Sequence, residues 1–139
     1  MDATYMIRSC LFVNDNPEDQ RIFIHALSDV FPSTLCFMAN DGREALEIMQ
    51  EDELVPDYIF MELKMPGIDG MEFLREVRKI NTKKEPVIIV HSIDPAPTKV
   101  MELKAMGAFA IYFKPYDYWG TCNLLRLYFH QDNVRANLN

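Results

Sequence analysis

The chain has few cysteines and no long hydrophobic run, and each shortage argues against a class of protein. Its three cysteines are widely spaced, so they form neither a metal-binding pattern nor a disulfide framework. Cys10 and Cys36 lie in apolar runs and are expected to be small core residues. No apolar run approaches the roughly 20 residues of a membrane-spanning helix, and the first residues lack the features of a signal peptide. These absences indicate a cytoplasmic protein.

Basic residues are also scarce. Lysine and arginine number 14 against 21 acidic residues, which gives a net charge of −7. This balance argues against nucleic-acid binding, which depends on neutralising phosphates with basic side chains. Glycine is missing from the turn after the first apolar run, which is Asn14-Asp15-Asn16-Pro17. This absence argues against a small α/β enzyme or flavin carrier, because a glycine-rich phosphate loop is expected there in such a protein.

Five apolar runs alternate with five helical patterns along the 139 residues. Strands are predicted at 7–13, 34–38, 58–61, 86–90 and 109–113. Helices are predicted at 17–30, 42–49, 70–80, 98–106 and 117–130. Asn16 before Pro17 is a predicted N-cap, Asp69 caps the third helix, and Gly107 ends the fourth. The alternation predicts one parallel sheet with helices on both faces, although periodicity does not give the strand order.

The predicted strands end on polar side chains. In such a sheet, ligands bind outside the carboxyl ends of the strands, so these residues are the candidate site. They are Asn14 and Asp15, Glu62, His91 and Ser92, and Lys114. The predicted domain covers 5–130 and the predicted tail 131–139, without a linker leading to a second domain.

The chain resembles the receiver domain of response regulators in two-component signalling over about 5–130. Five motifs carry the resemblance: Val13-Asn14-Asp15, Met65-Pro66, Asp69-Gly70, Gly107-Ala108 and Phe113-Lys114-Pro115. The resemblance implies a flavodoxin-like (βα)5 doubly wound sheet of strand order 2-1-3-4-5. It also implies a non-enzymatic partner of a histidine kinase or another signalling protein. The resemblance further implies that the chain can form a homodimer through the fourth helix, the fifth strand and the fifth helix.

The resemblance assigns a role to each strand-end residue. The phosphoacceptor position, an aspartate in the family, is Glu62, and the two acids that help to hold Mg²⁺ correspond to Asn14 and Asp15. The remaining assignments are the metal-binding carbonyl of Lys64, the hydroxyl position at His91 with Ser92 beside it, the lysine at Lys114, and the aromatic switch at Ile111. The bond from Lys114 to Pro115 is often cis in the family.

Four of these positions depart from the family pattern: Asn14, Glu62, His91 and Ile111. Asn14 removes a negative charge that would attract Mg²⁺ and is expected to be a hydrogen-bonding turn residue. Tyr112, next to Ile111, is expected to point to the opposite face of the sheet. Glu62 places its carboxylate about 1.5 Å further into the pocket, where it is expected to pair with Lys114.

These departures predict a pseudo-receiver that acts in a phosphorelay by protein–protein interaction without being phosphorylated. The alternative is an active receiver, with Mg²⁺ on Asp15 and the Lys64 carbonyl, that takes a phosphoryl group from a histidine kinase. No cofactor is certain on either interpretation, and Mg²⁺ is left open. A group of aromatic residues is a candidate partner-binding face or the rim of the core: Tyr112, Tyr116, Tyr118, Trp119 and Tyr128.

Overall fold

The computed structural model describes residues 8–51, 55–65, 67–80, 85–93, 96–114 and 117–138. Five strands form one sheet in the order β2-β1-β3-β4-β5, and every neighbouring pair is parallel. The strands are β1 (Ser9–Val13), β2 (Leu35–Ala39), β3 (Tyr58–Glu62), β4 (Val87–Ser92) and β5 (Ala110–Phe113). The predicted fold class and strand order are confirmed.

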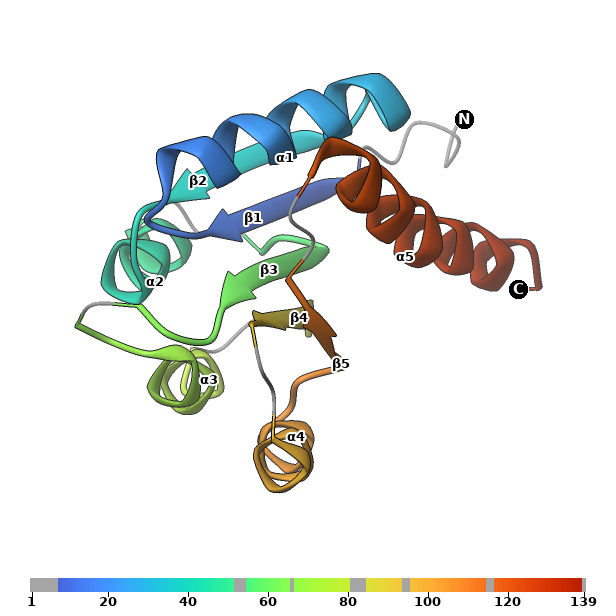
Figure 1. The fold of residues 1–139 in the computed structure, drawn as a ribbon. Coiled ribbons are helices and arrows are strands. Elements are labelled where there is room, and N and C mark those ends of the chain that lie inside the picture. Colours follow the sequence, from blue (N-terminus) through green and yellow to red (C-terminus); the bar gives the residue numbers. More distant parts are fainter. Residues whose placement is uncertain are drawn as a thin grey trace.

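Five helices cover the two faces of this sheet (Figure 1). They are α1 (Pro17–Val30), α2 (Gly42–Glu51), α3 (Gly70–Val77), α4 (Pro97–Ala105) and α5 (Tyr118–Leu138). Helices α1 and α5 pack together on one face, whereas α2, α3 and α4 lie on the other. None of the described helices is long and apolar enough to cross a membrane.

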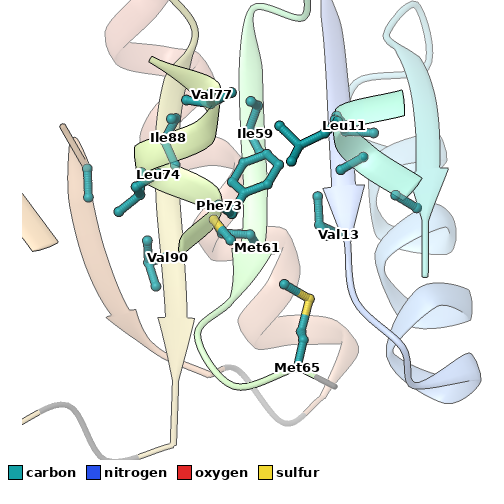
Figure 2. Packing of buried hydrophobic residues seen from close by; sticks show 14 of the residues in the cluster. Leu11, Val13, Ile59, Met61, Met65, Phe73, Leu74, Val77, Ile88 and Val90 are labelled. Carbon is teal, nitrogen blue, oxygen red and sulfur yellow. The ribbon is translucent and has the colours of Figure 1, made fainter. Parts of the chain in front are cut away.

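Strand alternation divides the buried side chains into two cores. In β3, Ile59 and Met61 join the core under α2, α3 and α4, while Tyr58 and Phe60 join the core under α1 and α5. Figure 2 shows Phe73 of α3 packed over the first of these cores. Burying an aliphatic or aromatic side chain of this size stabilises the fold by roughly 1.5–3 kcal/mol. Both faces of β3 are covered, which explains why this strand is apolar up to its last residue.

The predicted helix caps are confirmed. The Asn16 side chain accepts hydrogen bonds from the backbone N–H groups of Glu18 (2.9 Å) and Asp19 (3.0 Å). The Asp69 carboxylate accepts one from the N–H of Glu72 at 3.0 Å. Gly107 follows α4 with φ +113°, a left-handed conformation that glycine adopts without steric cost. Asn16 and Asp69 therefore fix where α1 and α3 begin, directly beside the ends of β1 and β3.

Several element boundaries differ from the prediction, among them the ends of α3, α5 and β4. Helix α5 continues to Leu138, past the predicted end at His130, because no glycine or proline interrupts the chain after Gly120. Strand β4 extends to Ser92, so His91 and Ser92 are its last residues rather than the loop after it. Ile7, Pro66, Pro115 and Tyr116 lie outside the described residues, as does the predicted bond from Lys114 to Pro115.

Candidate functional site

Backbone hydrogen bonds align the polar ends of the strands at one edge of the sheet. The N–H of Leu63 donates to the carbonyl of His91 (2.9 Å), and the N–H of Lys114 donates to the carbonyl of Ser92 (3.0 Å). Glu62 and His91 are register partners in β3 and β4. The structure therefore brings the candidate residues from β3, β4 and β5 together, as the parallel sheet predicts.

Asn14 is a buried turn residue at the end of β1. Its Oδ1 accepts a hydrogen bond from the N–H of Asn16 at 2.8 Å, and its Nδ2 donates to Asp19 Oδ2 at 3.4 Å. The Asn14 carbonyl accepts a further bond from Gln20 Nε2 at 2.7 Å. The predicted turn role is confirmed, and the side-chain oxygen of Asn14 is already used within the chain.

Lys114 forms an ion pair that the sequence analysis missed. Its Nζ lies 2.6 Å from Asp19 Oδ2, and both side chains are largely shielded from solvent. The ion pair that the structure gives Lys114 among the described residues is with Asp19 of α1, whereas at Glu62, its predicted partner, the Lys114 charge acts only through its effect on the pKa. Asp19 stands three residues after the N-cap, where a first-turn acid faces back toward the end of the preceding strand. This spacing is the feature of the sequence from which the position of Asp19 beside the site could have been predicted.

Glu62 is a poorly compensated buried carboxylate. Its side chain is 9% exposed, and Oε2 has no hydrogen-bond partner in the part of the chain that is described. Burial raises the pKa of Glu62, the Lys114 charge opposes this rise, and the charges of Asp19 and Asp15 add to it. The proton is therefore held more tightly at Glu62 than on an ordinary glutamate.

His91 is a buried neutral histidine. Its ring centroid lies 6.0 Å from that of Phe60 and 6.5 Å from that of Phe12, on the α1/α5 side of the sheet. Burial, together with the Lys114 charge, lowers the pKa of His91 to about 4, against a smaller opposing effect of Asp19. Nε2 has no hydrogen-bond partner among the described residues. His91 therefore contributes a neutral ring rather than a cation at pH 7.

A small cavity lies beside these side chains. Its volume is about 20 Å³, and polar groups of Asn14, Asp19, His91 and Lys114 contribute to its lining. A cavity of this size holds about one water molecule. Glu62 is not among the residues that line it.

The described residues at this edge offer few ligands to a resident Mg²⁺ ion. Within the described ranges, no group of three histidine, cysteine or acidic side chains is placed to hold a metal. Asp15 is an exposed carboxylate, Lys64 is also exposed, and the Asn14 oxygen is already bonded to Asn16. Mg²⁺ demands a near-octahedral set of oxygen ligands, commonly including one or two carboxylates. We therefore derive no step through a metal.

Strand β5 places its two central side chains as predicted. Ile111 packs against the core under α2, α3 and α4, whereas Tyr112 joins the opposite core with its ring centroid 5.3 Å from that of Tyr128. Tyr128 is buried and Trp119 is 70% exposed, so the aromatic residues divide between core and surface.

The parallel order 2-1-3-4-5 and the strand-end acids define a receiver-type protein. Residues 10–121 match the response regulator receiver domain, and the chain belongs to this family. It is 33% identical over 111 residues to the regulatory protein AtoC of Escherichia coli, covering 80% of this chain and 23% of AtoC. The chain thus spans about a quarter of that relative's length.

Solved structures show the same fold. The chemotaxis protein CheY4 of Vibrio cholerae superposes with a TM-score of 0.75 at 29% identity, covering 86% of this chain and 97% of CheY4. A response regulator of red-light signalling in R. palustris gives a TM-score of 0.75 at 21% identity, covering 88% and 92% of the two chains. Receiver domains are generally non-enzymatic modules that interact with histidine kinases or other signalling proteins.

Proposed function

We propose that this receiver domain signals through protein contacts and is not phosphorylated at Glu62. The main support for the proposal is the environment of Glu62, the side chain at the acceptor position. The Glu62 carboxylate is buried with an unpaired oxygen, while the Lys114 ammonium is 2.6 Å from Asp19. A phosphoacceptor needs an ionised, exposed oxygen close to compensating cations, and Glu62 has a raised pKa.

The length of the glutamate side chain supports the same conclusion. Glu62 ends β3 at a backbone position fixed by its pairing with β4. The extra methylene moves the carboxylate by about 1.5 Å from the place of an aspartate carboxylate. Misplacement of a reacting atom by about 1 Å can cost about 100-fold in rate. Transfer to Glu62 would therefore be slow even with a suitable donor.

Ser92, the hydroxyl residue that follows His91, does not replace the hydroxyl missing at that position. Ser92 is buried, but strand alternation directs its side chain to the opposite face from His91. The neutral His91 ring lies among Phe12 and Phe60 and occupies space beside the small cavity. The pocket therefore favours a permanently unphosphorylated domain over a phosphorylated one.

The second candidate is an active receiver that binds Mg²⁺ through Asp15 and the Lys64 carbonyl. The observation in its favour is the exposure of the Asp15 carboxylate, which has no ion pair among the described residues. This candidate requires the Glu62 carboxylate to leave its buried position and Lys114 to move from Asp19. The structure would have to rearrange at both side chains, so the active receiver is the weaker candidate.

Exposed apolar side chains on β5 and α5 support an interaction role. Phe113 is 66% exposed and Trp119 is 70% exposed. A hollow of about 250 Å³ lies between the two elements, lined by Tyr112, Phe113, Gly120, Asn123, Leu124 and Leu127. Aromatic residues are enriched in the centres of protein interfaces. A kinase, another signalling protein or a second copy of the chain are the partners we propose for this face.

Fluoroberyllate, a mimic of the phosphoryl group, tests the proposal on the wild-type protein with Mg²⁺ present. Trp119 is the single tryptophan and follows Lys114 at the start of α5, so its fluorescence reports on this end of the sheet. We expect no saturable change in fluorescence, because the acceptor oxygen is buried and the pKa of Glu62 is raised. A saturable response that Glu62→Gln abolishes would refute the proposal. Glu47→Gln, on the exposed surface of α2, is the matched control.

A further inference from the structure

Two cysteines that are far apart in the sequence are direct neighbours in the sheet. Cys10 of β1 and Cys36 of β2 are register partners in the parallel pairing of these strands. Neighbouring strands lie about 4.7–4.9 Å apart. Disulfide bonds join residues whose Cα atoms are about 4.4–6.8 Å apart, so the strand spacing places this pair within the range.

The two thiols also face each other. Both side chains lie on the α1/α5 side of the sheet, Cys10 within the core there and Cys36 packed against it, on paired neighbouring strands. The Cys36 thiol has one further weak contact, from Sγ to the carbonyl of Phe37 at 3.9 Å. The third cysteine, Cys122, lies on α5 rather than in the sheet and is buried. The register therefore selects one pair out of the three cysteines.

The two thiols differ in their exposure to solvent and in their pKa. Cys10 is fully buried, whereas Cys36 is half-buried on the edge strand beside Leu35, which is 53% exposed. The neighbouring Cys10 thiol lowers the pKa of Cys36 against the effect of burial, and the neighbouring Cys36 thiol and burial raise the pKa of Cys10. Asp57 reinforces and Arg8 opposes the rise at Cys10. Cys36 is thus the more reactive thiol and Cys10 the proton donor.

We propose that Cys10 and Cys36 form a redox-active thiol pair that a peroxide converts into an intramolecular disulfide. The Cys36 thiolate attacks one peroxide oxygen, so a sulfur–oxygen bond forms, the oxygen–oxygen bond breaks, and hydroxide leaves. The Cys10 sulfur then attacks the sulfenic sulfur, and the hydroxyl group leaves as water with the Cys10 proton. Both sulfurs are oxidised, and the peroxide is reduced to hydroxide and water.

The disulfide would tie the edge strand β2 to β1 just upstream of the candidate site. Cys10 precedes Val13, the last residue of β1, and the N–H of Asn14 already donates to the β2 carbonyl of Ala39 at 3.0 Å. Oxidation would thus add a covalent link to the pair of strands that positions Asn14. Cys10 pairs with Tyr58 at the start of β3, whereas Glu62 ends that strand, so oxidation of the cysteines does not require phosphorylation of Glu62.

Treatment of the folded wild-type chain with hydrogen peroxide tests this proposal. We expect the intact mass to fall by two hydrogens and a thiol reductant to restore it. Trypsin cleavage at Arg21 places Cys10 and Cys36 on different peptides, so a non-reducing digest identifies the bond. The Cys122→Ser variant is expected to match the wild type, and Cys36→Ser is expected to lose the crosslink.

The variant Cys10→Ala separates the formation of the Cys36 sulfenic acid from the formation of the disulfide. Cys10→Ala lacks the resolving thiol, so its Cys36 sulfenic acid should accumulate and react with dimedone, while the wild type should give little adduct. The far-ultraviolet circular dichroism spectrum of each variant checks that it is folded. Three free thiols after peroxide treatment of the wild type would overturn the proposal. Equal yields of all pairings, including those with Cys122, in folded and urea-unfolded chains would overturn it as well.

Discussion

The triple variant Asn14→Asp, Glu62→Asp, His91→Thr is expected to take up a phosphoryl group at position 62 from acetyl phosphate and Mg²⁺. The three changes restore a second acid after β1, shorten the acceptor side chain, and replace the ring that lies beside the small cavity. We expect its rate to exceed that of the wild type by more than about 100-fold, the effect of a misplacement near 1 Å. Intact mass spectrometry over time measures the rate.

The single variant Glu62→Asp is expected to recover only a small part of this activity. Its shorter side chain corrects the position of the carboxylate, but Asn14 Oδ1 stays bonded to the N–H of Asn16 and the His91 ring stays in place. Glu47→Asp, at an exposed position of α2, controls for a general effect of the substitution. A folded triple variant that remains unmodified would show that the three residues do not account for the lost chemistry.

The His91→Phe variant is expected to resist acid unfolding better than the wild type. In the wild type, the pKa of His91 falls from 6.5 to about 4 on folding, so the unfolded state binds the proton first as the pH decreases. The contribution of the neutral His91 ring to the free energy of unfolding is fully present above pH 6.5. It is lost progressively as the pH falls toward 4. The shift corresponds to about 3 kcal/mol at 1.36 kcal/mol per pKa unit. Phenylalanine lacks the titrating group and suits the contacts with Phe12 and Phe60.

Urea unfolding at several pH values between 4 and 7.5 measures this difference. Glu62 acts in the opposite direction, because its raised pKa favours the folded state as the pH falls, but it is present in both proteins. Asp19 and Lys114, the other charged groups that act on His91, are also unchanged. A pH dependence that His91→Phe leaves unchanged would show that His91 titrates normally.

The sequence predicted those features that depend on neighbours in the chain. The caps at Asn16 and Asp69, the end of α4 at Gly107, and the opposite faces of Ile111 and Tyr112 follow from local spacing. The strand order came from the resemblance to receiver domains, because periodicity shows which segments are strands and not which strands pair. The backbone of the candidate site was therefore predictable from its motifs.

Contacts between distant elements were not predictable in the same way. The partner of Lys114 proved to be Asp19, because α1 brings a carboxylate to the site that the motifs assign to no role. The pairing of Cys10 with Cys36 depends on the register of β1 against β2, and cysteine spacing along the chain does not encode it. Helix α5 extends beyond its predicted end at His130. No glycine or proline follows Gly120 to end the helix, and no motif in the sequence marks its last residue.

Whether the wild-type chain accepts a phosphoryl group is decided most directly by its intact mass after incubation with acetyl phosphate and Mg²⁺. The buried Glu62 carboxylate, the Lys114–Asp19 ion pair and the His91 ring predict an unchanged mass. The folded triple variant under the same conditions shows that the donor and the assay are effective. A stoichiometric phosphoryl adduct on the wild type, mapped to Glu62, would contradict this prediction.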